Sequence, residues 1–221
     1  NVVSAVNIYT SNPMPQVCDG EDITITVYGA STYSWFPPTY LNTAIGSTVT
    51  ITPQDTITYT ITAQNASGCS DQTTFFVDLL PAPNINITSS SLSICDGSSV
   101  PINASGANTY LWSPLSGLNT NIGSVVNASP SISTQYKVVG TDVNGCQDSS
   151  YTTISVNPLP VLNIIGSNMT CEGQSVSLLA NGAQSYIWFP SIGLDTTAGS
   201  TVIANPSSSQ TYTIVGSDLN Q

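Results

Sequence analysis

Three stretches of the sequence share one pattern: YSWFPPTYLNTAIGSTV begins at Tyr33, YLWSPLSGLNTNIGSVV at Tyr110 and YIWFPSIGLDTTAGSTV at Tyr186. They align without gaps, and their tryptophans lie 77 and 76 residues apart. Self-similarity at a fixed period is typical of repeat proteins, in which each copy folds as one structural unit. The chain therefore consists of tandem repeats of about 77 residues.

Residues outside these stretches keep the same register. Each tryptophan is preceded by a cysteine and a glycine at fixed distances and followed by a tyrosine, namely Cys18, Cys95 and Cys171, then Gly29, Gly106 and Gly182, then Tyr59, Tyr136 and Tyr212. Cys69 and Cys146 follow the first two tryptophans at one common distance, and the third such position would be 222, one past the last residue. We expect the tail of a preceding repeat at 1–5, repeats at 6–82 and 83–159, and an incomplete repeat at 160–221 that lacks its last strand. The chain is then a window on a longer array.

The short strands predict the fold class. Residues 22–27 (DITITV) and 56–62 (TITYTIT) alternate with the period of two that half-buried strands show, and no helical stripe reaches ten residues. Six or seven such strands per repeat, with Asp-Gly and Asn-Gly turns between them, predict an all-β, immunoglobulin-like (PKD-like) β-sandwich. Asn144-Gly145 predicts a two-residue hairpin turn. The expected core residues are Trp35, Trp112, Trp188, Tyr59, Tyr136 and Tyr212.

Composition excludes several classes of function. Twelve acidic residues stand against one basic residue, Lys137, so the net charge is −11, which disfavours nucleic acid and anionic lipid as partners. No apolar run is long enough to insert into a membrane. Since the chain has no histidine, the usual Ser-His-Asp and Cys-His catalytic systems cannot be built. We therefore expect no enzymatic activity and no cofactor.

Two groups of side chains could still bind a ligand. Asp19, Glu21 and Asp22 could hold Ca²⁺, which binds six to eight oxygens. The other repeats keep a single carboxylate there, Asp96 or Glu172, and one carboxylate beside glycine is typical of a turn, so we favour a turn and no metal. The three tryptophans could serve as platforms for sugar rings, but a tryptophan on the third strand of a sandwich is usually a core residue.

The motif set resembles a known family. Residues 94–97 (ICDG), 106–112, 113–114 (SP), 117–118 (GL), 135–136 (QY), 144–146 (NGC) and 157–160 (NPLP) look like the Ig-like or PKD-like repeats of large Bacteroidota surface proteins exported by type 9 secretion, often with a gliding-motility-associated C-terminal region. The resemblance covers essentially the whole chain. Repeat one departs from it at 37–40, where PPTY replaces the usual glycine before leucine. Asp55-Thr56-Ile57 and Asp195-Thr196-Thr197 resemble the O-glycosylation sites of such exported proteins, which implies Thr56 and Thr196 as possible acceptors.

The five cysteines allow two pairings. The equal spacing of Cys18–Cys69 and Cys95–Cys146 suggests bonds within each repeat, and an exported protein would oxidise its cysteines. The first cysteine of each repeat lies at the turn between strands A and B, and the second lies at the turn between strands F and G. In an immunoglobulin-like sandwich, however, these two turns lie at opposite poles, too far apart for one disulfide. In a head-to-tail rod, these poles of neighbouring repeats meet. We therefore favour Cys18–Cys146 across the first linker, with Cys69 paired to the preceding repeat, Cys95 to position 222 and Cys171 to a fourth repeat.

The sequence favours a structural function. Repetition with short proline-containing linkers is typical of proteins that provide length and reach. The resemblance implies the shaft of a secreted, extracellular cell-surface adhesin or filament, for attachment, gliding or prey capture. The alternative is a carbohydrate-binding module of a secreted polysaccharide-degrading protein. Expected partners are further copies of the repeat, a laterally bundled homo-oligomer, and a surface glycan or another cell.

Overall fold

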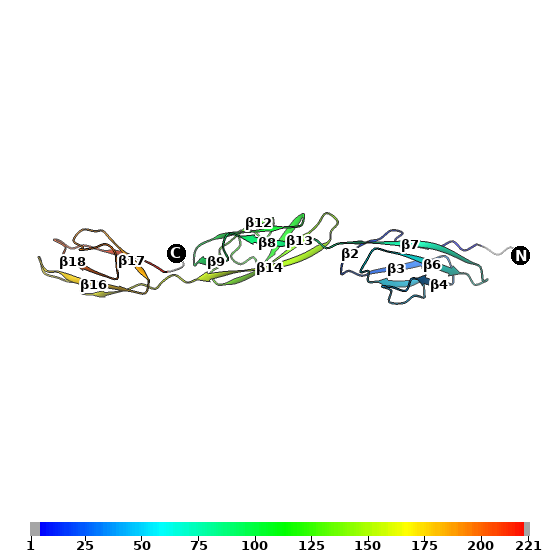
Figure 1. Ribbon diagram of the computed structural model, residues 1–221, viewed down its shortest axis with the longest axis horizontal. Coiled ribbons are helices and arrows are strands. Elements are labelled where there is room, and N and C mark those ends of the chain that lie inside the picture. The colour runs from blue at the N-terminus through cyan, green and yellow to red at the C-terminus, as the bar shows by residue number, and fades with distance from the viewer. Residues whose placement is uncertain (1–4, 219–221) are drawn as a thin grey trace.

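The computed structural model describes residues 5–218, and every regular element in that range is a β-strand. The strands form three units that follow one another along an elongated molecule (Figure 1). No helix that could cross a bilayer occurs between residues 5 and 218. The chain is thus a row of tandem β-sandwich repeats, as the sequence predicts.

The first repeat contains seven strands in two sheets. One sheet has the order β1-β3-β5 and the other β2-β7-β6-β4. Strand β2 runs parallel to the end of β7, while the remaining neighbours are antiparallel. The strands are β1 (Tyr9–Thr10), β2 (Gln16–Cys18), β3 (Ile23–Tyr28), β4 (Thr32–Phe36), β5 (Thr48–Ile51), β6 (Ile57–Gln64) and β7 (Ser70–Leu80).

The second repeat reproduces this arrangement strand for strand. Its sheets have the orders β12-β10-β8 and β11-β13-β14-β9, and β9 again runs parallel to the end of β14. The strands are β8 (Asn86–Ser89), β9 (Ser93–Cys95), β10 (Val100–Ser105), β11 (Thr109–Ser113), β12 (Val125–Ala128), β13 (Thr134–Thr141) and β14 (Gln147–Asn157).

The third repeat has five strands among the described residues. Its sheets are β15-β16-β18 and β17-β19. The strands are β15 (Asn163–Gly166), β16 (Val176–Asn181), β17 (Ser185–Phe189), β18 (Thr201–Ala204) and β19 (Thr213–Ser217). Up to Asp218, nothing pairs with β19 on the side where β14 covers β13 in the second repeat.

The strand order is immunoglobulin-like. In each complete repeat, strands A, B and E form one sheet and strands A′, G, F and C the other, with A′ parallel to G. Alternate residues of each strand point into the space between the sheets, as the period-two pattern requires. The predicted fold class, tandem immunoglobulin-like sandwiches, is confirmed.

Each repeat encloses its own apolar core. The tryptophans are at most 3% exposed, and Tyr59 and Tyr136 are fully buried. In the first core, the Trp35 ring meets Tyr59 and Phe75 edge to face, at centroid distances of 6.0 and 5.9 Å. Edge-to-face contact suits the ring quadrupoles and adds to the hydrophobic effect.

One expected core residue is only half-buried. Tyr212 packs against the third core but stays partly exposed, unlike its counterparts Tyr59 and Tyr136. The difference arises because the strand that would cover it, corresponding to β7 and β14, has no counterpart among the described residues. Tyr212 therefore contacts the core, as expected, but it is less buried than Tyr59 and Tyr136.

The Asn144-Gly145 turn differs from the expected two-residue hairpin. The ladder of β13 and β14 ends at the pair Thr141 and Gln147, so the loop has five residues, 142–146. Only Gly145 in this loop has a positive φ, of 90°. The Asp142 carboxylate accepts hydrogen bonds from the backbone N–H groups of Asn144 and Cys146, both at 2.8 Å, which stabilises the longer loop.

Candidate functional site: the cross-linked junction between repeats

The repeated aromatic residues hold the loop between strands C and E. The indole Nε1 of Trp35, Trp112 and Trp188 donates to the carbonyl oxygens of Gly46, Gly123 and Gly199, at 3.2, 3.0 and 3.0 Å. The hydroxyls of Tyr59, Tyr136 and Tyr212 donate to the carbonyl oxygens of Thr39, Ser116 and Ile192, at 2.7, 2.9 and 2.7 Å. These side chains therefore stabilise the sandwich, and none of the three tryptophans is available as a sugar platform.

The glycine ahead of each tryptophan also has a structural role. Gly106 has a φ of 103°, and a Cβ there would overlap the carbonyl oxygen of Asn84. Gly29 and Gly182 meet the backbone of Asn7 and Val161 in the same way. Each repeat thus fixes the direction in which the incoming linker crosses strand B. The motif encodes both the sandwich and its connection to the preceding segment.

The most specific feature outside the cores is a disulfide between the first two repeats. The structure joins Cys18 to Cys146, with their Cα atoms 5.4 Å apart and 128 positions apart in sequence. This separation lies inside the range that a disulfide tolerates. It is the pairing that the sequence analysis favoured.

Strand pairing places Cys18 at the far pole of repeat 1. Cys18 ends β2 and lies beside Leu80, the last residue of β7. The backbone N–H of Asp19 donates to the carbonyl oxygen of Leu80 at 2.9 Å, which extends the ladder by one bond. Because the linker follows Leu80 directly, Cys18 lies next to the point where the main chain passes out of repeat 1.

On the repeat 2 side of the junction, Cys146 lies in the tight loop between β13 and β14. The cysteine is fully buried, and its backbone N–H and C=O both bond to Asp142, the N–H to the carboxylate and the C=O to the N–H at 2.9 Å. In repeat 1, Asn65 bonds to Cys69 through the same two contacts, each at 3.0 Å. Asp142 and Asn65 are residues that sequence reasoning missed, although Asx side chains four residues before a cysteine could have signalled this loop.

The same geometry excludes the alternative pairing within a repeat. Cys69 directly precedes Ser70, the first residue of β7, whereas Cys18 lies beside Leu80 at its other end. A strand of this length spans about 33 Å at about 3.3 Å per residue. A disulfide bridges no more than about 7 Å between Cα atoms. Cys18 and Cys69 therefore cannot bond without unfolding the strand.

The other cysteines occupy matching places. Cys95 ends β9 beside Asn157, as Cys18 ends β2 beside Leu80. Cys69 lies half-buried at the opposite pole of repeat 1, and Cys171 is exposed. The pairings expected for Cys69, Cys95 and Cys171 involve positions outside residues 1–221 and stay predictions.

The acidic residues near Cys18 form a turn. The backbone N–H of Glu21 donates to the carbonyl oxygen of Cys18 at 3.0 Å, with Asp19 and Gly20 at the corners of the turn. Asp19, Glu21 and Asp22 are all exposed, and no group of three potential metal ligands occurs between residues 5 and 218. The same turn recurs after Cys95 and Cys171, closed by Ser98 and Gln174. Asp19 and Glu21 thus belong to a turn, and Asp22 follows it.

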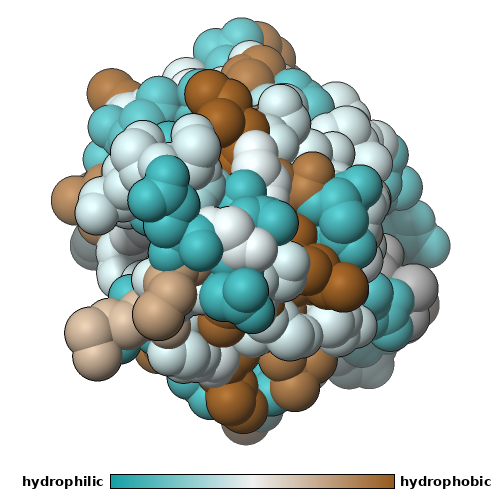
Figure 2. All heavy atoms as spheres, turned by 90° about the vertical axis from the view of Figure 1, so that its left-hand side faces the viewer, coloured by the Kyte–Doolittle hydropathy of each residue, from teal (hydrophilic) through white to brown (hydrophobic). Residues whose placement is uncertain are grey.

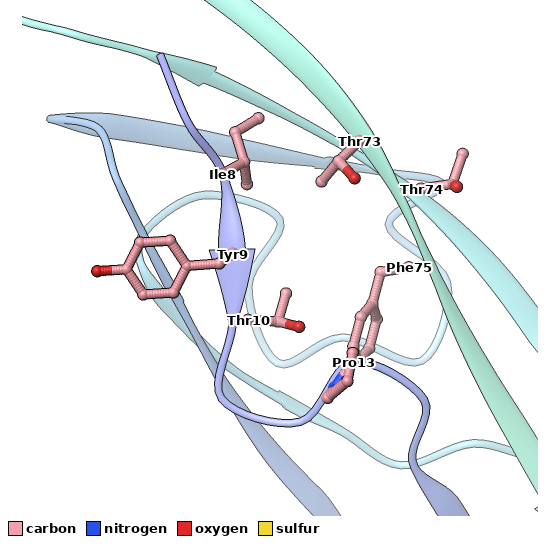
Figure 3. Close-up of a pocket in the computed structure, with 7 residues that line it drawn as sticks. All are labelled: Ile8, Tyr9, Thr10, Pro13, Thr73, Thr74 and Phe75. Carbon is pink, nitrogen blue, oxygen red and sulfur yellow. The ribbon is translucent and has the colours of Figure 1, made fainter.

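The surface pockets contain few charged or reactive side chains. A pocket of about 380 Å³ lies between β1 and β7 and contains no acidic, basic or thiol side chain. In Figure 3 the Tyr9 ring turns away from this pocket, whose lining is Ile8, Tyr9, Thr10, Pro13, Thr73, Thr74 and Phe75. A second pocket at the end of repeat 3 lies among loops 167–172 and 206–210. Figure 2, which faces that end of the molecule, shows hydrophobic side chains in separate groups among hydrophilic ones.

One exposed aromatic pair is specific to repeat 1. Tyr9 and Tyr28 are cross-strand partners on β1 and β3, and their rings stack with centroids 5.3 Å apart. They are 59% and 43% exposed. The aligned pair in repeat 2 is Asn86 and Ser105. The sequence alone does not reveal this pair, because only the strand register brings the two tyrosines together.

The two candidate glycosylation threonines are exposed. The Thr56 hydroxyl accepts the Leu79 N–H at 3.0 Å and lies 3.5 Å from an Asp78 carboxylate oxygen. The Thr196 hydroxyl caps its own loop by bonding to Ala198. Both hydroxyls lie at the surface but take part in local turns.

Comparisons with solved structures find tandem immunoglobulin domains. Titin domains I67–I69, in an E-to-A mutated variant, share 16% identity over 98% of this chain and 95% of that chain, with a TM-score of 0.41. The insect immune protein hemolin shares 17% identity over 72% and 49%, with a TM-score of 0.36. The N-terminal eight Ig domains of DSCAM share 15% over 98% and 39%, with a TM-score of 0.29. No protein-family model and no curated protein sequence matches the chain.

Proposed function

We propose that this chain is part of the shaft of a secreted bacterial surface adhesin or extracellular filament. The observation that carries the proposal is the junction at which a disulfide and a short linker both join repeats 1 and 2. Because β7 ends at Leu80 and Ile85 is buried in the next core, the linker between the two repeats is residues 81–84. A second covalent connection beside a short, proline-containing linker restrains bending and twisting, as a shaft requires.

The repeat motif supports the same proposal. Its tryptophans and tyrosines donate hydrogen bonds within their own sandwich, and its glycines allow the incoming segment to cross closely, so the shared residues serve architecture. Repeated units that contact only their neighbours add length. The resemblance to Bacteroidota surface proteins adds export by type 9 secretion and display outside the cell, where the disulfide would persist. Thr56 and Thr196 would then be candidate glycan acceptors.

Immunogold electron microscopy tests this function. Antibodies raised against the 221-residue chain should label the cell exterior or filaments extending from it in the source bacterium. Labelling confined to the cytoplasm would contradict an extracellular shaft. Proteinase treatment of intact cells serves as a second measurement, since an external epitope is lost and an internal one survives.

The exposed tyrosine pair favours a second candidate function, binding of a neutral glycan. Aromatic rings stack on sugar rings, and the sheet face beside the pair carries threonine hydroxyls, Thr26 with Thr48 at 3.2 Å and Thr24 with Thr50 at 3.1 Å. Affinity electrophoresis in gels containing neutral polysaccharides tests it. Tyr9→Ala should abolish any retardation while Tyr151→Ala, at an exposed tyrosine beside Lys137, should not. No retardation of the unaltered chain would exclude this candidate for the glycans used.

A further inference from the structure

The Cys18–Cys146 bond encloses most of two repeats in one covalent ring. Along the backbone the two residues are 128 positions apart, whereas through the sulfurs their Cα atoms are 5.4 Å apart. Strands β3 to β13, the linker and two of the three tryptophans all belong to the ring. Outside it lie β1 and most of β2, then β14 and the third repeat. The bond is therefore a short covalent connection that bypasses the cores of repeats 1 and 2.

Tension applied to the chain ends follows the shortest covalent path, since slack backbone carries no load. We propose that the disulfide is a mechanical clamp, which passes tensile force from β2 of repeat 1 directly to β14 of repeat 2. Residues 19–145 are then not stretched while the bond is intact. The clamp acts in the setting of the proposed shaft, where pulling forces occur, but it is a property of the chain itself.

The anchoring of both cysteines suits this role. Force enters Cys18 from β2, which is hydrogen-bonded in parallel to β7 and whose Gln16 side chain bonds to Asp78 at 3.1 Å. It leaves Cys146 into β14, which pairs with β13 over eight residues and with β9 at its far end. In each repeat the loaded segment is thus a strand already extended within a sheet, and the rest of the sandwich packs against it.

Burial protects the bond. Cys146 is fully buried and Cys18 half-buried, in a junction closed by the turn after Cys18 and the loop held by Asp142. Thiol–disulfide exchange needs access of a thiolate to one sulfur, so restricted access slows reduction in the folded protein. The clamp should therefore hold under mild reducing conditions and open only when the junction opens.

Single-molecule stretching of the 221-residue chain, held by handles at its two ends, tests the clamp. Opening the ring releases 128 residue steps, which at about 3.3–3.6 Å each adds about 420–460 Å to the fully extended length. The oxidised chain should therefore extend less than Cys18→Ser by that amount. Cys171→Ser, at an exposed cysteine outside the ring, is the matched control and should extend like the unaltered chain.

Each outcome decides the proposal. The expected length difference, together with two fewer titratable thiols in the unaltered chain than after reduction in denaturant, supports the clamp. Equal extension of the oxidised chain and Cys18→Ser overturns it, and so does a full set of free thiols. Failure of surface labelling would contradict the shaft function but leave the stretching result unchanged, so the two proposals fail separately.

Discussion

Trp112 donates its indole hydrogen to the carbonyl oxygen of Gly123, with 3.0 Å between Nε1 and that oxygen. The bond connects the centre of the core to the loop between β11 and β12, and it recurs in the other two repeats. One side chain thus joins the two sheets and also fixes the longest loop of the repeat. This relationship explains why the tryptophan and the Ile-Gly-Ser or Ala-Gly-Ser segment after it recur together.

Truncating this tryptophan should destabilise repeat 2. Trp112→Ala removes a large, fully buried side chain and leaves the Gly123 carbonyl without its donor, so we expect a loss of about 3–5 kcal/mol. Leu111→Ala, at the neighbouring position on the outer face and 52% exposed, should cost less than about 1 kcal/mol. Hydrogen exchange of the β13 amides measures the local free energy of opening. Equal effects of the two substitutions would be inconsistent with the described core.

The linker crossing should be sensitive to a single methyl group. Gly106→Ala places a Cβ against the Asn84 carbonyl and also requires an alanine at positive φ, so we expect a loss of about 3 kcal/mol or more. Gly97→Ala is the control, because Gly97 has a φ of 82° but open space around it. It should lose only the cost of positive φ, about 1–2 kcal/mol. If Gly97→Ala proved the more damaging, the close approach at Gly106 would be refuted.

Alkaline pH should destabilise repeat 1 through Tyr59. Burial, and to a smaller extent the nearby Tyr40, raises the pKa of Tyr59 from 10.0 to about 12. The folded state thus keeps a proton that the unfolded state releases near pH 10, so this stability is complete below pH 10 and is lost as pH rises to about 12. Urea unfolding at pH 9–12, with tyrosinate absorbance, measures it. Tyr59→Phe should reduce the pH dependence, and an unchanged dependence would count against this assignment.

Side-by-side association is a further prediction for the shaft. Leu111 and Ile122 form a bridge on the outer face of repeat 2, at 52% and 64% exposure, on a surface with few charges. Strand edges with few charges are weakly protected against lateral pairing. We expect extended arrays to associate with rising concentration in sedimentation velocity, and Leu111→Lys to weaken this association. A monomer at every concentration would contradict the bundling.

Much of the fold can be predicted from the sequence, because strands and repeats appear there as a regular spacing of residue types. The alternation in residues 56–62, the Tyr-x-Trp segments and the fixed distances between repeats are enough to predict the sandwich and its core tryptophans. The cysteine pairing followed from the positions of the poles, which strand order alone determines. These features need no knowledge of side-chain contacts.

Other features depend on tertiary context. Tyr40 takes a φ of 66° at the position where Gly117 has 73°, so the loop of repeat 1 keeps its shape although it lacks the glycine. The Tyr40 side chain packs against the core, which compensates for the unfavourable backbone angle. The stacking of Tyr9 on Tyr28 depends on strand register, and the length of the loop at Asn144 depends on the Asp142 carboxylate. Local sequence patterns do not contain this information.

Non-reducing peptide mapping tests the central claim, a rod cross-linked between repeats, most directly. Because the chain contains a single basic residue, the oxidised protein is digested with pepsin, and its linked peptides are identified by mass spectrometry. We predict a peptide pair joining Cys18 to Cys146, which disappears on reduction. A pair joining Cys18 to Cys69, or Cys95 to Cys146, would contradict the cross-linked junction and with it the clamp.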